Sequence, residues 1–139
     1  KPTLYLSDFF ERNKSLYYDN LTFVRESNKL GQWIKFFLVA VIETAKNGID
    51  TFREILKLKE KIESKIVTLG RKAPNARKLI NQLYRNPIIS STTVVKLLGI
   101  TANPAYNLLN DFVKLNILRE ITGSKRNRMY SFQEYITLF

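Results

Sequence analysis

Two residue types that carry much of enzyme chemistry are absent from this chain of 139 residues. It has no cysteine, which excludes disulfide bonds, thiolate metal sites and a cysteine nucleophile. It has no histidine, so the commonest general base, the commonest zinc ligand and Ser-His-Asp chemistry are all missing. Paired carboxylates and glycine-rich phosphate loops do not appear either. We therefore expect no catalytic residue, no metal site and no cofactor in this chain.

Long apolar runs and an amino-terminal targeting signal are also missing. The most apolar run, residues 33–42, contains Lys35 and is too short to cross a bilayer. It predicts a buried helix instead. No signal peptide is visible, so we expect a cytoplasmic protein that makes no membrane contact. The only methionine is Met129, and we therefore expect the chain to be part of a longer protein.

Positive charge is abundant and unevenly distributed. The chain has 23 Lys and Arg against 12 Asp and Glu, a net charge of +11. Residues 71–139 hold 11 of these cations and 3 of the anions, and so carry +8 of the total. Five cations come early in this segment: Arg71, Lys72, Arg77, Lys78 and Arg85. They either extend a positive track for a polyanion or form a solvated helix face.

Residues 87–132 predict a winged helix-turn-helix, in which a short helix, a longer helix and a β-hairpin follow one another. Gly99 can end the first helix in the left-handed conformation, and Thr101 can cap the second. Asn116 follows the second helix at a position where the chain must again turn left-handed, which Asn tolerates. The hairpin is expected to pair residues 119–122 with residues 128–132.

The second helix of this unit has an apolar face and a polar face. The apolar face is expected to consist of Ala105, Leu108, Leu109, Phe112 and Leu115. The polar side, together with the residue before the helix, comprises Thr101, Asn103, Tyr106, Asn107, Asn110 and Lys114. Amide and hydroxyl groups of this kind can reach base edges in the major groove of duplex DNA. We expect these six residues to bind nucleic acid.

The hairpin loop presents a second group of cations. Lys125, Arg126 and Arg128 lie close together in the sequence, and their charge suits a phosphate backbone better than a base. Short basic loops are also common on protein surfaces, and winged helices also serve in dimerisation or protein docking. Both uses of the unit therefore remain open.

Residues 1–70 predict two antiparallel helices. Ser7 can cap the first, and the second begins near Gln32 and continues to Leu69, with a bend expected at Gly48. The later part of the second helix has a narrow apolar stripe that needs a partner, either a helix at residues 74–86 or a second copy of the chain. The expected fold is mainly α, with a helical segment at 1–70 followed by a winged helix-turn-helix domain at 71–139 that contains a small β-hairpin.

Short motifs in a fixed order give the chain a family resemblance. They are Leu4-Tyr5-Leu6-Ser7, Tyr17-Tyr18-Asp19-Asn20-Leu21 and Trp33-Ile34-Lys35-Phe36-Phe37-Leu38. These motifs look like the YLS…YYDaL…WI.FFL series that follows the catalytic motif of Fic proteins. The winged unit is similar to the carboxy-terminal extension of many members, in which Arg85-Asn86-Pro87-Ile88-Ile89-Ser90 and Gly99-Ile100-Thr101 fall in familiar places.

Most Fic proteins are adenylyltransferases that transfer AMP from ATP to a hydroxyl group of a target protein, using a HxFx[DE]GNGRxxR motif. The resemblance implies that the parent protein does this, with ATP and Mg²⁺ as cofactors. No residue of that motif can be assigned here, because the chain has no histidine and no GNGR; the motif is expected to precede Lys1.

We therefore expect a non-catalytic part of such an enzyme, whose winged helix is a DNA-binding, regulatory module. The alternative is a protein-interaction or dimerisation module that positions the Fic core or its target. The expected partners are duplex DNA, the upstream Fic core, the target protein of AMPylation and a second copy of the chain.

Overall fold

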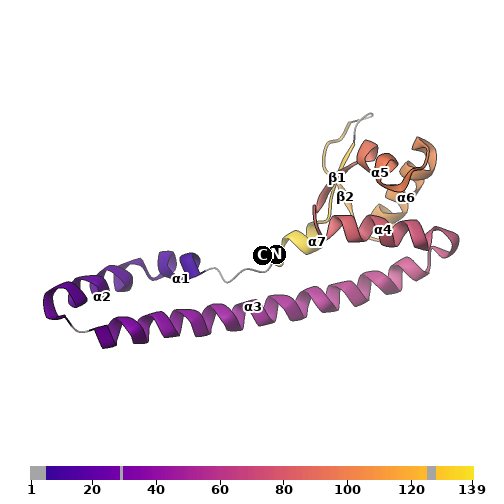
Figure 1. Ribbon diagram of the computed structural model, residues 1–139. Coiled ribbons are helices and arrows are strands. Elements are labelled where there is room, and N and C mark those ends of the chain that lie inside the picture. Colours follow the sequence, from indigo (N-terminus) through magenta and orange to yellow (C-terminus); the bar gives the residue numbers. More distant parts are fainter. Residues whose placement is uncertain (1–5, 29, 125–127) are drawn as a thin grey trace. The chain divides into compact units, whose positions relative to one another are not determined.

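The computed structural model of the protein describes residues 6–28, 30–124 and 128–139. These residues are mainly helical and include a small antiparallel sheet, as the sequence predicted (Figure 1). The chain divides into two compact units, Lys1–Arg53 and Glu54–Phe139. The division falls inside the longest helix. None of the described helices combines the length and the hydropathy needed to span a membrane.

The first unit contains α1 (Leu6–Arg12), α2 (Lys14–Ser27) and the beginning of α3 (Leu30–Val67). The single first helix that the sequence predicted is interrupted at Asn13, whose side-chain amide donates to the carbonyl of Phe9 at 2.9 Å. Ser7 lies inside α1 and does not cap it. Helix α3 continues through Gly48 without a break, since an isolated glycine weakens a helix without ending it. The second helix is therefore confirmed, and the cap at Ser7 is wrong.

An aromatic cluster holds the first unit together. The ring of Phe9 lies 5.7 Å from that of Phe36, and the ring of Phe10 lies 5.2 Å from Tyr17 and 6.5 Å from Trp33, measured between centroids. Most other apolar side chains of the early part of α3 are exposed. Among the large apolar side chains of residues 33–42, the exposed fraction is 51% for Ile34, 52% for Leu38 and 53% for Ile42. The prediction that residues 33–42 form a buried helix is wrong for this unit, because α1 and α2 cover only one side of α3.

The second unit begins with the end of α3 and the helix that packs against it. A short 3₁₀ turn, η1 (Gly70–Lys72), leads into α4 (Ala73–Leu83), which has proline in its first turn. Buried side chains of α3 and α4 belong to one core. They are Leu58, Ile62 and Ile66 of α3 and Ala76, Leu79, Ile80 and Leu83 of α4. Ile62 and Ile66 of the narrow apolar stripe thus pack with α4, one of the two partners that the sequence predicted, whereas Phe52 and Leu56 of the same stripe stay more than half exposed.

The remaining elements of the second unit follow α4 in the chain (Figure 1), and their buried side chains belong to the same core. They are β1 (Ile88–Ser90), α5 (Ser91–Leu98), α6 (Ala102–Lys114), β2 (Arg119–Glu120), β3 (Met129–Ser131) and α7 (Gln133–Ile136). The sheet order is β1-β3-β2, and both pairs are antiparallel. In the register of the sheet, Tyr130 of β3 pairs with Ile89 of β1 on one side and with Glu120 of β2 on the other. The strands of the hairpin are shorter than predicted, and β1 was not predicted at all.

Candidate nucleic-acid interface

Helices α5 and α6 are joined by a three-residue turn with defined ends. The hydroxyl of Ser90 accepts the amide hydrogen of Thr93 at 3.1 Å and so caps α5. Gly99 ends α5 in the left-handed conformation, with φ 63°, and its amide donates to the carbonyl of Val95. This confirms the predicted role of Gly99. Thr101 precedes α6 in an extended conformation, but its side chain makes no capping bond, so the predicted side-chain cap is wrong.

Helix α6 separates apolar and polar side chains almost completely. Ala105, Leu108, Leu109 and Phe112 are buried, each with 3% or less of its surface exposed. Leu115, expected on the same face, is only partly buried because it follows the last helical residue. The opposite side carries exposed Asn103, Asn107, Asn110 and Lys114, and Thr101 before the helix is exposed too. We call Asn103, Asn107, Asn110 and Lys114 the polar stripe of α6.

Tyr106 differs from the other residues predicted to bind nucleic acid. Its side chain is partly buried, and its hydroxyl accepts a hydrogen bond from the hydroxyl of Ser91 at 3.2 Å. Ser91 is the first residue of α5 and is itself buried. Tyr106 therefore helps to fix α6 against α5, a contact that helical periodicity alone does not reveal.

The chain reverses direction after α6 through a left-handed residue. Asn116 has the predicted left-handed conformation, with φ 52°, and its backbone amide donates to the carbonyl of Val113 at 3.0 Å. The carbonyl of Leu115 accepts from the ammonium group of Lys65 on α3 at 2.7 Å. These bonds satisfy the end of α6 and direct the chain into β2.

The beginning of the hairpin loop is built around one carboxylate. Glu120 accepts hydrogen bonds from the amides of Thr122, at 2.9 Å, and Gly123, at 2.8 Å, and from the Thr122 hydroxyl. These bonds, led by the one from the Thr122 hydroxyl, lower the pKa of Glu120. Gly123 has φ 63°, so the turn needs a residue that tolerates this conformation.

Of the three loop cations, Arg128 lies within the described residues and Lys125 and Arg126 lie outside them. The Nε of Arg128 donates to the carbonyl of Ser124 at 2.9 Å, which fixes its guanidinium close to the turn. Burial raises the pKa of Tyr130, and the neighbouring guanidinium of Arg128 opposes that rise. Arg128 thus contributes to the structure of the hairpin as well as to its charge.

Residues distant in sequence adjoin the polar stripe. The ammonium group of Lys72 pairs with the carboxylate of Asp111, which follows Asn110 on α6. A small hollow of about 170 Å³ lies beside this ion pair. It is lined by Lys72, Asn75, Ile100, Pro104, Asn107 and Leu108. The sequence analysis missed Asn75 as a neighbour of Asn107, because nothing in the local pattern connects the two helices.

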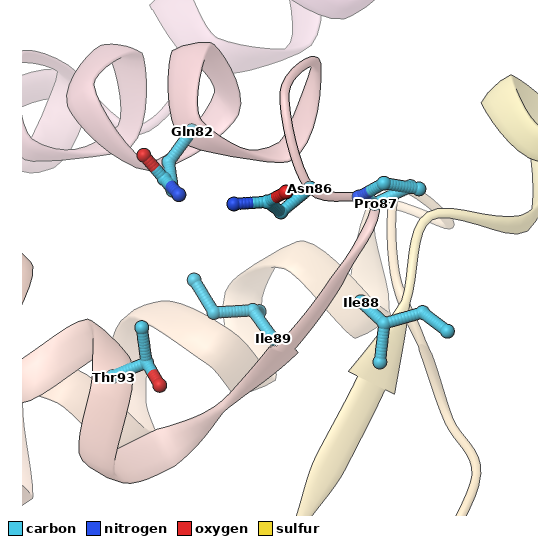
Figure 2. Close-up of a pocket in the computed structure, with 6 residues that line it drawn as sticks. All are labelled: Gln82, Asn86, Pro87, Ile88, Ile89 and Thr93. Carbon is cyan, nitrogen blue, oxygen red and sulfur yellow. The ribbon is translucent and has the colours of Figure 1, made fainter.

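A larger hollow, of about 470 Å³, lies between the end of α4, β1 and α5. Figure 2 shows the amide groups of Gln82 and Asn86 side by side over Ile89 and Thr93. Its lining contains amides, a hydroxyl and apolar groups but no ionisable side chain. This hollow therefore offers no group for acid or base catalysis.

Comparisons with known proteins leave these features to be interpreted from their geometry. No protein-family model matches the sequence, and no match was found among curated proteins.

Proposed function

We propose that residues 71–139 are a winged helix-turn-helix domain that binds duplex DNA. The observation that carries the proposal is helix α6, which follows a tight turn, buries one face and leaves a stripe of amides exposed. The order α4, β1, α5, α6, β2 and β3, with β3 central in the sheet, supports it. In helix-turn-helix proteins the second helix of the motif enters the major groove.

In this arrangement the amides of α6 read bases and the hairpin contacts the backbone. An Asn side chain can make a pair of hydrogen bonds to the N6 and N7 edge of adenine. Asn103, Asn107 and Asn110 are the side chains available for this role, since all three are exposed. Arg128, with Lys125 and Arg126, would bind phosphates and fix the position of the hairpin on the duplex.

We propose further, from the sequence resemblance, that the chain is a non-catalytic part of a Fic-type protein adenylyltransferase. Catalysis, ATP and Mg²⁺ would belong to a segment with the HxFx[DE]GNGRxxR motif, which this sequence lacks. DNA binding would then tether or regulate that enzyme. Detection of the motif upstream of Lys1 in the native gene would support this assignment, and its absence there would contradict it.

A protein-interaction role is the second candidate, and a separate observation favours it. In the first unit, Ile34, Leu38, Ile42 and Ile49 on α3 are each more than half exposed. Contiguous apolar surface of this kind marks interaction sites in soluble proteins. In this alternative the first unit packs against an upstream Fic core, a target protein or a second copy of the chain.

Selection of bound sequences from a pool of random duplex DNA, followed by fluorescence anisotropy of the full chain with the selected duplex, tests the DNA-binding proposal. Wild type should enrich a preferred sequence and bind it with an affinity that falls as salt rises. The N107A/N110A variant should lose about 1–3 kcal/mol on that sequence for each bidentate contact removed, and should retain non-specific binding.

The matched control is N47A/Q133A, which removes two exposed amides outside α6. Its affinity and base preference should equal those of wild type. Absence of wild-type binding at low salt would reject the DNA-binding proposal in favour of protein interaction.

A further inference from the structure

The structure separates the five cations around α4 into two groups. Lys72 pairs with Asp111, and Arg77 pairs with Glu63. Arg71, Lys78 and Arg85 are exposed, and none of the three makes an ion pair or a side-chain hydrogen bond with any residue that the structure describes. Asp111 and Glu63 are therefore already paired with the other two cations.

The three remaining cations follow one another at intervals of seven residues. Seven residues are close to two helical turns, so side chains at this spacing share one side of a helix and lie about 10 Å apart along it. Arg71 lies in η1, before α4, and Arg85 lies two residues after the end of α4. The residues at the two ends of α4, Lys72, Ala73 and Tyr84, have right-handed helical backbone angles, so the helical path continues towards both cations. Together the three cover a length of about 21 Å. We call them the α4 row.

The α4 row does nothing visible for the fold. The buried side of α4 is formed by Ala76, Leu79 and Leu83, and the row lies on its exposed side. Three cations on one exposed side of a helix form a positive surface that suits a polyanion. The phosphates of duplex DNA provide one negative charge for every 1.7 Å or so of helix axis.

One end of the α4 row lies close in sequence to the contact between α4 and α6. The ion pair between Lys72 and Asp111 joins η1 to α6, and Asn75 of α4 and Asn107 of α6 line the same hollow. Arg71 immediately precedes Lys72, so the row begins one residue before this ion pair. At about 3.4 Å per base pair, the length of the row corresponds to roughly six base pairs of duplex.

We propose that Arg71, Lys78 and Arg85 bind the phosphates of duplex DNA beyond the segment held by α6. This inference rests on the proposed DNA-binding function and extends it. Contacts between these cations and phosphates carry no sequence information, so the row adds affinity for all sequences and lengthens the contacted segment. Its contribution is therefore electrostatic and sensitive to salt.

The experiment measures the affinity of the full chain for a duplex of about 25 base pairs at several salt concentrations. Each phosphate contact contributes roughly 0.9 to the slope of log affinity against log salt. The R71Q/K78Q/R85Q variant should therefore lower the slope by up to about 2.7. The control, R25Q/K35Q/K46Q, removes the same charge from exposed cations of the first unit that make no ion pair with a described residue, and its slope should equal that of wild type. Thermal unfolding followed by circular dichroism should give the same midpoint temperature for both variants as for wild type.

Duplex length provides a second readout that a general effect of net charge would not produce. Removing about six base pairs from the end that reaches α4 should lower the wild-type slope to that of R71Q/K78Q/R85Q. The same shortening should leave the slope of R71Q/K78Q/R85Q unchanged.

The proposal that the α4 row binds phosphates would be overturned if wild type and R71Q/K78Q/R85Q had equal salt slopes, or if R25Q/K35Q/K46Q lowered the slope by the same amount. DNA binding itself would still stand in either case. Failure of wild type to bind any duplex at low salt would overturn both the row and the proposed function.

Discussion

The two faces of α6 predict opposite outcomes for neighbouring substitutions. Leu109 has 0% of its surface exposed, whereas Asn110, the next residue, is exposed. Replacing Leu109 with Ala removes three buried carbon atoms and leaves a cavity lined by the core of the second unit. A fully buried Leu→Ala change costs about 2–5 kcal/mol. Replacing Asn110 with Ala removes a solvated amide, and such surface changes stay within about 0.5 kcal/mol.

The cost at Leu109 is large relative to the stability of the unit. A unit the size of residues 54–139 is stable by only about 4–13 kcal/mol, so Leu109→Ala should remove a major part of the free energy of unfolding. With a urea dependence of about 1–3 kcal/mol per molar, a loss of 3 kcal/mol lowers the unfolding midpoint by roughly 1–3 M.

Urea unfolding of both variants, followed by far-UV circular dichroism, measures this difference. The Asn110→Ala midpoint should match wild type, which makes it the control for Leu109→Ala. A loss below about 1 kcal/mol for Leu109→Ala would show that α6 does not bury this face as described, because Leu→Ala changes at buried positions typically cost about 2–5 kcal/mol.

Two further predictions concern the turns that flank the candidate interface. Asn116 has φ 52°, so Asn116→Ala should cost about 1 kcal/mol of stability while Asn116→Gly should cost less, measured as urea midpoints; equal values would contradict a left-handed turn at this residue. Hydrogen bonds from Thr122 and Gly123 lower the pKa of Glu120 in the folded protein. The carboxylate therefore stabilises the turn fully when the pH is above 4.5, the ordinary pKa of a glutamate, and this stabilisation is lost as the pH falls through the lower pKa of the folded state. Carbon-13 NMR of the Glu120 carboxyl group should show this lowered pKa, and amide exchange of Gly123 should accelerate over the same acidic range; an ordinary pKa in the folded chain would contradict the hydrogen-bonded turn.

Local sequence determined α4, α5 and α6 and the two faces of α6, whereas α7 was not predicted. A helix places residues three and four positions apart on the same side, so the spacing of Ala105, Leu108 and Phe112 was enough to predict the buried face. The left-handed turns at Gly99 and Asn116 were predictable for a similar reason. Few residues tolerate positive φ, and these two stood where helices had to end.

The tertiary structure alone decided which polar groups are free to act. Lys72 and Asp111, 39 residues apart, pair because η1 and α6 meet. This contact distinguishes Lys72 from Arg71 and Lys78, which make no ion pair with a residue that the structure describes. The bond from Ser91 to Tyr106 in the same way converts a predicted base-reading residue into a partly structural one.

Strand β1 and the exposed side of α3 show the same limit. Three residues after a proline have no periodicity to detect, and β1 forms because β3 pairs with it along its whole length. The composition of residues 33–42 indicates an apolar helix, yet burial requires a neighbour, and α1 and α2 contact only one side. Periodicity and backbone preference are properties of a short segment and can be read from it, whereas ion pairing, strand pairing and burial are properties of two segments and depend on which parts of the chain meet.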